Sequence, residues 1–352
     1  MNNINNINSV LAFVGTKFYN HLRKTERGNI LVSPPGIMAI VNTLLKSSTD
    51  RTKYQFLDNF RILTEEHNVE QMLVEILSST QYESLYLIDT KKKLNLNYKR
   101  YMNKSDISTI VIGELTTLCD IMKRLNYSLE DILSVAEEYF DSAFVFDIRY
   151  TGLWETQFMD YDSHRFSVTR FTVKAVPYMI TSGMLGYIYY HEVRAHIVNI
   201  PYLHNTYSLC LIFADTYRNF KYLESRLTPS VLLSTKTIFS NMIYTDITIS
   251  FPKFSAVTHH DLKSVFEKIG ITDLFDNNAS MKSLSPDTIP LTKLCMKVQV
   301  DFLNNRFLLT DQKRWENVSK NRFHLDKPFM FLIKYNKTNS ILFLGKVKDP
   351  SQ

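Results

Sequence analysis

The chain has 352 residues, with 41 Lys or Arg against 35 Asp or Glu, so its formal net charge is +6. Hydrophobic residues make up 45% and charged residues 22%, an ordinary globular composition that excludes a disordered or membrane-embedded chain. So small a surplus of positive charge over this length is too dilute to indicate nucleic acid as a partner. No window holds the roughly 18 uninterrupted apolar residues of a membrane-spanning helix.

The amino terminus and the cysteines bear on the compartment. The opening residues have no basic flank, and the apolar run at residues 10–14 is about half as long as the apolar region of a secretory leader. We therefore expect no cleaved leader and a cytoplasmic location. The three cysteines, Cys119, Cys210 and Cys295, are odd in number and far apart, which excludes a disulfide scaffold and a zinc ribbon.

The first half of the chain is predicted to be mainly helical. Apolar residues recur every four positions from Val10 to Leu22, which predicts a helix that starts near Asn8 and ends at Gly28. A short strand at residues 30–32 follows. Ser33 and Pro34 then predict the start of a second helix, because proline lacks the amide that would be unsatisfied there. Residues 65–133 are predicted to be mostly helix.

The second half is predicted to be mainly strand. Alternating and continuous apolar runs predict strands at 166–173, 197–200, 209–213 and 247–251. A helix around residues 262–269 is predicted to end at Gly270, since glycine tolerates the left-handed conformation after a helix. Two apolar runs, 329–335 and 341–344, flank a turn-rich segment and predict a hairpin buried on both faces.

No catalytic chemistry emerges from the residues. His259 and His260 are adjacent and diverge, and His191 and His196 would face opposite sides of a strand. Neither a G-x-S-x-G nucleophile elbow nor a glycine-rich phosphate loop occurs. An isolated Cys/His nucleophile pair stays open, although nothing local favours it. We therefore expect no enzymatic activity, no metal site and no cofactor.

One basic stretch is a candidate binding site for a polyanion. Its cations are Lys91, Lys92, Lys93, Lys99 and Arg100, followed by Lys104, with no acid among them. Tyr98 and Tyr101 are interleaved, as in surfaces that bind polyanions. The plainer interpretation is a solvated edge of a strand and a helix.

Six segments, in order along the chain, resemble the serpin family. They are residues 29–37 (NILVSPPGI), 153–158 (LWETQF), 200–213 (IPYLHNTYSLCLIF), 251–275 from FPKF to GITDLF, 323–331 (FHLDKPFMF) and 336–347 (NKTNSILFLGKV). The last two together resemble the family's pattern F-x-x-DHPF-x-F-x-I…NKTGSILFMGRV most closely. The compact chain and its Lys, Asn, Ile, Tyr and Phe usage are most similar to the short leaderless serpins of poxviruses.

The resemblance implies an α+β fold with three β-sheets and eight or nine helices, as a single serpin domain over residues 1–352. It also implies an exposed reactive-centre loop at about residues 303–322. In inhibitory members a protease cleaves this loop, which then inserts as an extra strand into the large sheet and distorts the acylated protease. Strain stored in the native state drives that change.

The stem of the loop departs from the family's pattern of small residues. The hinge falls at Asn304, Asn305, Arg306 and Phe307, with no glycine and no alanine run. Successive large side chains on an inserted strand cannot all avoid the packed interior, and each oversized group costs about 1–3 kcal/mol. A buried unpaired charge costs several kcal/mol more.

The resemblance also places the scissile bond and the sheet-opening residues. Counting back from Phe323 gives the bond Arg314-Trp315 or Trp315-Glu316, and the stem from Phe302 to Arg314 spans about 40 Å when extended, which is shorter than usual in the family. In the gating region under the central sheet, which the resemblance calls the shutter, Ser33 is retained. Gly36 replaces a second serine, Phe146 an asparagine, and Cys295 or Met296 a histidine. Trp154, at the upper opening of the large sheet, is also retained.

Three hypotheses follow. The first is a non-trapping serpin that acts as a binding, decoy or substrate-type protein in modulation of host proteases or of the host response. The alternative is a functional serine protease inhibitor with Arg314-Trp315 as its scissile bond. The third is an enzyme or polyanion receptor on the same fold. The expected partner is a host protease or other host protein, with no nucleic acid and no membrane, and the protein is expected to be a monomer in the host cytoplasm.

Overall fold

A computed structural model describes the chain over most of its length. The described residues are 2–60, 66–88, 92–96, 98, 109–112, 142–303 and 321–352. The chain divides into two compact units, each discontinuous in sequence. The first unit comprises Met1–Pro34, Tyr150–Thr258 and Gln299–Gln352, and the second comprises Pro35–Arg149 and His259–Val298. The prediction of a single domain over residues 1–352 stays a prediction.

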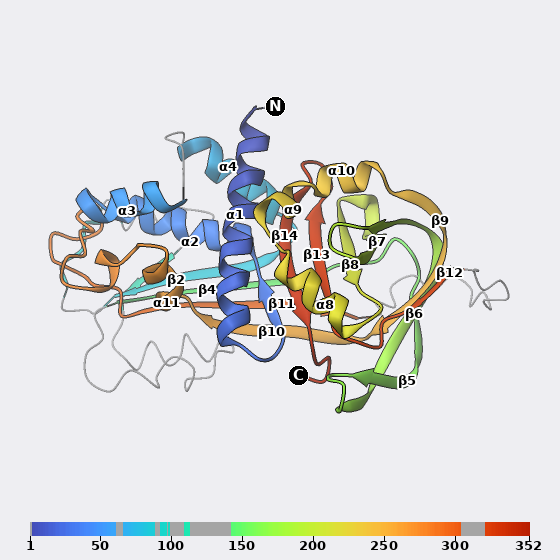
Figure 1. Cartoon of the computed structure of the whole chain (residues 1–352). Helices are drawn as coiled ribbons and strands as arrows, with labels where there is room; N and C mark the ends of the chain where they lie inside the picture. The colour runs from blue at the N-terminus through green and yellow to red at the C-terminus, as the bar shows by residue number, and fades with distance from the viewer. Residues whose placement is uncertain are drawn as a thin grey trace. The chain divides into compact units, whose positions relative to one another are not determined.

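The first unit is built on a nine-stranded sheet (Figure 1). Its strands are β1 (Ile30–Val32), β5 (Met159–Ser167), β6 (Val173–Tyr190), β7 (Ala195–Pro201), β8 (Tyr207–Phe213), β9 (Ile243–Pro252), β12 (Asn321–His324), β13 (Phe329–Tyr335) and β14 (Ser340–Val347). The order is β1-β14-β13-β8-β7-β6-β9-β12, with β5 paired to β6. The first strand of the chain therefore pairs with the last.

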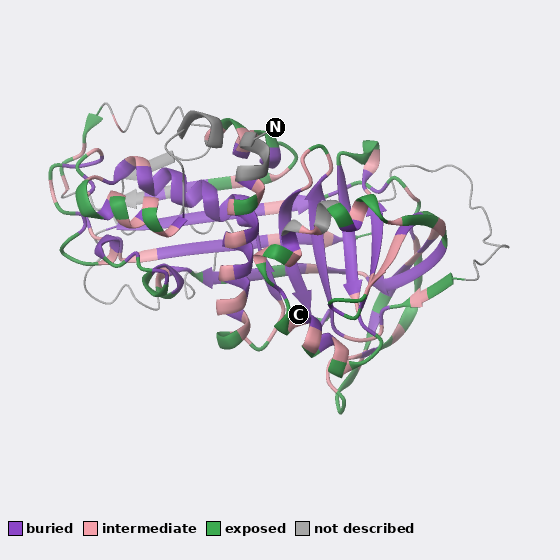
Figure 2. Cartoon of the chain, turned by 45° about the horizontal axis from the view of Figure 1, so that its top comes forward, coloured by how far each residue is buried: buried purple, intermediate pink, exposed green. Residues whose placement is uncertain are grey.

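The hairpin of β13 and β14 is buried on both faces, as predicted. Every residue of both strands is buried (Figure 2). The two strands pair antiparallel, with Phe331 opposite Gly345. A Cβ at Gly345 would lie 2.3 Å from the Phe331 ring, so the close packing of this ring requires glycine there. The strands predicted at 197–200 and 209–213 are confirmed as β7 and β8, which pair antiparallel.

The helices of the first unit begin with α1 (Asn2–Thr25), whose predicted apolar stripe is buried. The helix starts at Asn2, so the predicted start near Asn8 was wrong. The others are α8 (Tyr217–Ser225), α9 (Pro229–Leu233), α10 (Thr235–Ser240) and a 3-10 turn at Leu203–Asn205. The Thr216 hydroxyl accepts the amide of Asn219 and so fixes the first turn of α8.

The second unit contains the remaining described helices, and two of them pack together through an aromatic cluster. Its helices are α2 (Pro34–Ser47), α3 (Asp50–Phe60), α4 (Glu66–Leu77), α11 (Lys263–Lys268) and a 3-10 turn at Asp273–Phe275. Phe266 of α11 packs against Phe56 and Phe60 of α3 with ring centres 6.4 and 5.7 Å apart. As predicted, Gly270 follows α11 with a positive φ of 101°, a conformation that glycine adopts without strain.

A second sheet has the order β10-β11-β4-β2-β3. Its strands are β10 (Phe254–Asp261), β11 (Lys293–Phe302), β4 (Ser142–Thr151), β2 (Gln81–Ile88) and β3 (Thr109–Ile112). The chain is therefore α+β, as the resemblance implied. Among the described residues, no helix is long and apolar enough to span a membrane.

Two further predictions of secondary structure were wrong. Within residues 65–133, β2 and β3 are strands, and in β2 the residues Ser84, Tyr86 and Ile88 are buried at a spacing of two. Residues 166–173 are not one strand. They form the end of β5, a turn, and the start of β6. In the turn, Thr169 Oγ1 accepts the amides of Phe171 and Thr172, and the Phe171 side chain is 96% exposed.

Candidate reactive loop and its anchor points

The segment predicted to be the reactive loop lies largely outside the described residues, which stop at Leu303 and resume at Asn321. The scissile-bond candidates Arg314, Trp315 and Glu316 therefore stay predictions. So do the hinge residues Asn304, Asn305, Arg306 and Phe307. What the structure describes is how the chain is held on either side of this segment, and both anchor points belong to the first unit.

Trp154 holds the chain at the start of the segment. Its indole Nε1 donates a hydrogen bond to the carbonyl of Leu303 at 2.9 Å. Its ring stacks on Tyr202, with centres 4.4 Å apart, and lies 4.7 Å from the ring of Phe158. Only 8% of Trp154 is exposed. The residue that the resemblance placed at the sheet opening thus contacts the last described residue before the loop.

The tight stack on Tyr202 depends on a neighbouring glycine. Residues 154 and 202 form an isolated antiparallel bridge, which brings the chain close to the Tyr202 ring. A Cβ added at Gly152 would lie 2.3 Å from that ring. Gly152 is therefore required for the approach, although no sequence pattern singled it out.

Asp301 fixes the end of β11 through three hydrogen bonds. Its carboxylate accepts the hydroxyl of Thr151 at 2.6 Å, the side-chain amide of Gln299 at 3.0 Å, and the hydroxyl of Ser255. These donors come from β4, β11 and β10, so one side chain ties three strands together. Sequence reasoning missed this cluster because its members lie up to 150 positions apart.

Phe302 secures the opposite face of the same strand end. Its ring is fully buried and lies 4.9 Å from both Phe254 and Phe331. Consecutive residues of a strand point to opposite faces, so Asp301 bonds on one side while Phe302 packs on the other. The chain is thus held on both faces immediately before the loop.

The chain is held again after the loop, by β12. This strand pairs parallel with β9 over residues 321–324. The Phe323 ring lies 5.3 to 5.4 Å from the rings of Tyr187, His196 and Phe213. These contacts fix the far anchor point in the same sheet that contains the hairpin of β13 and β14.

His324 is the titratable member of this second anchor. Its Nδ1 lies 2.7 Å from the Ser250 hydroxyl, and its ring stacks on Tyr178 at 4.8 Å. Burial lowers the pKa of His324 below its ordinary value of 6.5, and the nearby His164 and Lys327 act in the same direction, whereas Asp326 opposes them. The neutral imidazole is therefore favoured in the folded protein.

Ser33, the retained shutter residue, lies in the core of the first unit. It is fully buried and donates its hydroxyl to the carbonyl of Leu342 at 3.0 Å. The departures from the family pattern lie in the second unit. There Phe146 is fully buried and stacks on Tyr82, and Cys295 and Met296 are also buried. Apolar and sulfur side chains thus occupy positions where the family has polar ones.

Two neighbouring strands of the second sheet, β4 and β11, are buried on both faces over most of their length. β4 is buried over residues 142–148, and β11 is buried over residues 294–298. Asp147 and Lys297 are 3% and 4% exposed. Burial lowers the pKa of Lys297, while the charge of Asp147 favours its protonated form.

The basic stretch is only partly described. Lys91, Lys99 and Arg100 lie outside the described residues. Lys92 donates its ammonium to the carbonyl of Thr288 at 3.3 Å, and the Lys93 amide bonds Asp287 at 2.9 Å. The polyanion site stays a prediction. Within the described part of the chain, no three His, Cys, Asp or Glu side chains gather as they would around a metal ion.

Comparisons with known proteins establish the class. The family model described as serpin (serine protease inhibitor) matches residues 122–350. The chain belongs to the serpin family. It is 51% identical over 357 residues to an uncharacterized serpin-like protein of fowlpox virus (strain NVSL), covering 99% of this chain and 100% of that protein. The chain is thus most like the serpins of poxviruses, as the resemblance implied.

More distant relatives agree with this assignment. Human Serpin B3 is 22% identical over 396 residues, with 99% of this chain and 100% of that protein covered. Among solved structures, uncleaved ovalbumin superposes with a TM-score of 0.86 at 20% identity, covering 97% of this chain and 99% of that one. The fold is therefore that of a serpin.

Proposed function

We propose that this serpin acts on a host protease or another host protein without efficient covalent trapping, as a binding, decoy or substrate-type member of its family. The carrying observation is that β4 over residues 142–148 and β11 over residues 294–298 are buried on both faces. A strand inserted between them would have to bury its own side chains on both faces. The stem supplies Arg306, Phe307 and Asp311 for that position, where small side chains would be needed.

The charges of the two strands add a second obstacle. Lys297 of β11 is stabilised in its charged form by the carboxylate of Asp147 on β4. An inserted strand would increase the separation of β4 and β11 from one inter-strand spacing to two, that is, by about 4.8 Å. Both groups are buried, so the weakened attraction would be little compensated by water. Insertion is therefore opposed by electrostatics as well as by packing.

The test is incubation with trypsin-like, elastase-like and caspase-type proteases, followed by denaturing gels and thermal melting. We expect cleavage in residues 304–320 without an SDS-stable complex, and no large rise in melting temperature after nicking. A trapping serpin treated in parallel is the positive control for both readouts. A covalent complex that survives SDS would refute the proposal.

The alternative is a working inhibitor of a trypsin-like protease. The buried hydrogen bond of Ser33 and the contact of Trp154 with Leu303 support it, because the family's sheet-opening residues are retained at both places. Arg314 would then enter a specificity pocket that pairs arginine with a carboxylate. Under this alternative, Arg314→Ala abolishes complex formation with a trypsin-like protease, whereas Lys313→Ala leaves it intact.

We also propose that the protein acts as a monomer in the host cytoplasm. The similarity to a poxvirus protein supports a host-cell setting. Cys210 and Cys295 are buried and form no disulfide within the described residues, and burial raises the pKa of the Cys210 thiol to about 12, so that thiol stays protonated. Immunofluorescence of infected cells and size-exclusion chromatography with light scattering test the two statements. A secreted or dimeric protein would contradict them.

A further inference from the structure

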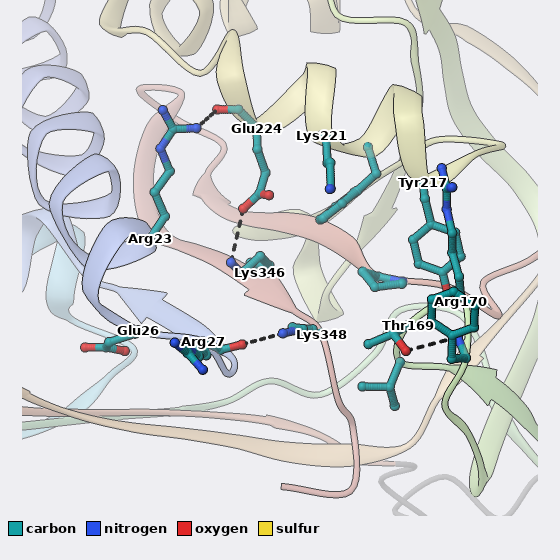
Figure 3. A pocket seen from close by; sticks show the side chains of 14 residues that line it. Arg23, Glu26, Arg27, Thr169, Arg170, Tyr217, Lys221, Glu224, Lys346 and Lys348 are labelled. Atoms are coloured by element: carbon teal, nitrogen blue, oxygen red, sulfur yellow. Dashed lines mark hydrogen bonds and ion pairs between the residues drawn. The ribbon is translucent and has the colours of Figure 1, made fainter.

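A surface cavity of about 490 Å³ lies entirely within the first unit. Figure 3 shows that its lining comes from the end of α1, from α8, from the turn between β5 and β6, and from the end of β14. Cavities of this size fall within the range of small-molecule sites, about 300–1,000 Å³. Pro328, just before β13, also lines it, and these five segments are far apart in sequence, so no motif marks the cavity.

The lining of the cavity is strongly basic. Six cationic side chains line it against two acidic ones, Glu26 and Glu224. The cations are Arg23, Arg27, Arg170, Lys221, Lys346 and Lys348. Figure 3 shows them distributed around the cavity, with Arg27 at one side, Lys221 above and Arg170 at the other side.

Three of these cations are already engaged. Lys346 forms an ion pair with Glu224 at 3.1 Å, and the same carboxylate accepts the Tyr19 hydroxyl at 2.9 Å. Arg23 donates to the Glu224 carbonyl at 2.8 Å, and Lys348 donates to the Arg27 carbonyl at 2.7 Å. These bonds hold the floor of the cavity in place and neutralise Glu224.

Three other cations are available to a ligand. The side chains of Arg27, Arg170 and Lys221 make no ion pair or hydrogen bond with any residue the structure describes. All three residues are exposed. Cations that converge on a concave surface without acidic partners raise the local concentration of anions. Arginine side chains also bind phosphate oxygens in a bidentate manner.

The cavity also has an aromatic and apolar side. Phe171 lines it with 96% of its side chain exposed, which is unusual for a large apolar residue. Phe220 is buried beneath, and the Tyr217 hydroxyl donates to the carbonyl of Ser167 at 2.5 Å, so that ring is fixed. An exposed aromatic ring beside free cations matches a ligand with a flat ring and several negative charges.

We propose that this cavity binds a small aromatic polyanion of the nucleotide class, with its phosphates on Arg27, Arg170 and Lys221 and its base against Phe171. The site is separate from the anchor points of the loop. Its occupation therefore does not depend on whether the serpin traps a protease. A nucleotide and inorganic phosphate would both present anionic oxygens to the three cations. Only the nucleotide has a base that could contact Phe171, so this contact distinguishes the two ligands.

The test is isothermal titration of the full chain with ATP and with inorganic phosphate at about 150 mM salt, where exposed charges are largely screened. We expect one saturable ATP site with a Kd below about 1 mM. The triple variant Arg27→Ala, Arg170→Ala, Lys221→Ala should weaken ATP binding at least about tenfold. Phe171→Ala should weaken ATP binding while leaving phosphate binding unchanged.

A charge-matched control removes three exposed cations from the same elements outside the cavity, as Lys24→Ala, Arg165→Ala and Arg218→Ala. It should bind ATP as the parent chain does, and the melting temperatures of all variants report folding. No saturable binding up to about 1 mM ATP would overturn the proposal, and so would an equal loss in the control. Equal binding of ATP and phosphate, with no effect of Phe171→Ala, would refute the aromatic ligand.

Discussion

Replacing Trp154 with phenylalanine removes one hydrogen bond and keeps an aromatic ring on Tyr202. The lost bond runs from the indole Nε1 to the Leu303 carbonyl, and Leu303 is 37% exposed, so water can reach the carbonyl. We expect the free energy of unfolding to fall by about 1 kcal/mol. Trp154→Ala also removes the buried ring and should cost about 4 kcal/mol.

Urea unfolding followed by circular dichroism measures both losses. Fluorescence is unsuitable because the chain has two tryptophans, and the other is Trp315 in the loop segment. With an unfolding entropy of about 2.1 cal/mol/K per residue, the phenylalanine variant should melt about 1–2 °C lower and the alanine variant about 5 °C lower.

Tyr202→Phe is the matched control within the same stack. The Tyr202 hydroxyl is buried and has no hydrogen-bond partner among the described residues, so its removal should leave stability unchanged or raise it. The reasoning fails if Trp154→Phe costs as much as Trp154→Ala, since packing would then contribute nothing. It also fails if Tyr202→Phe is the most damaging of the three.

Four further substitutions, in three experiments, test the anchor points. Gly152→Ala should lower the free energy of unfolding by about 1–3 kcal/mol, because its Cβ would meet the Tyr202 ring at 2.3 Å, and an unchanged urea midpoint would contradict this. Burial lowers the pKa of His324 from 6.5, so the unfolded chain binds more protons below about pH 6.5, and stability is full above that pH and falls below it. In His324→Gln this part of the pH dependence should disappear. Urea midpoints measured across about pH 4.5–7.5 test this, because histidine titrates between about pH 5 and 8. Phe302→Ala should lower the free energy of unfolding, measured in urea, by about 3–5 kcal/mol. Leu303 is exposed, so Leu303→Ala should lower it by less than about 1 kcal/mol. Equal losses would refute the conclusion that the buried Phe302 ring anchors the chain.

The parts of the fold that the sequence predicts correctly are those with a local cause. The hairpin of β13 and β14 follows from two continuous apolar runs around a polar turn, and the end of α11 follows from Gly270. β2 was missed because its buried residues alternate with polar ones within a region that otherwise favours helix. The turn after β5 was missed because Phe171 looks like a strand residue, although its ring faces solvent.

The residues of the candidate site also fall into those that the sequence locates and those that it does not. Ser33 and Trp154 stand in short motifs, so the resemblance locates them, and the structure describes their contacts. The Asp301 cluster and the basic cavity have no sequence signature, because each joins segments that meet only after the sheets have formed. Such sites follow from topology and require coordinates to be found.

The pairing of β1 with β14 has a consequence for biosynthesis. A ribosome adds about 5–20 residues per second, so roughly 15–60 s pass between the emergence of the first strand and that of its partner. Throughout this interval Ile30, Leu31 and Val32 lack the strand with which they pair in the folded sheet. The nine-stranded sheet therefore cannot be completed from its first strand until β14 has been synthesised.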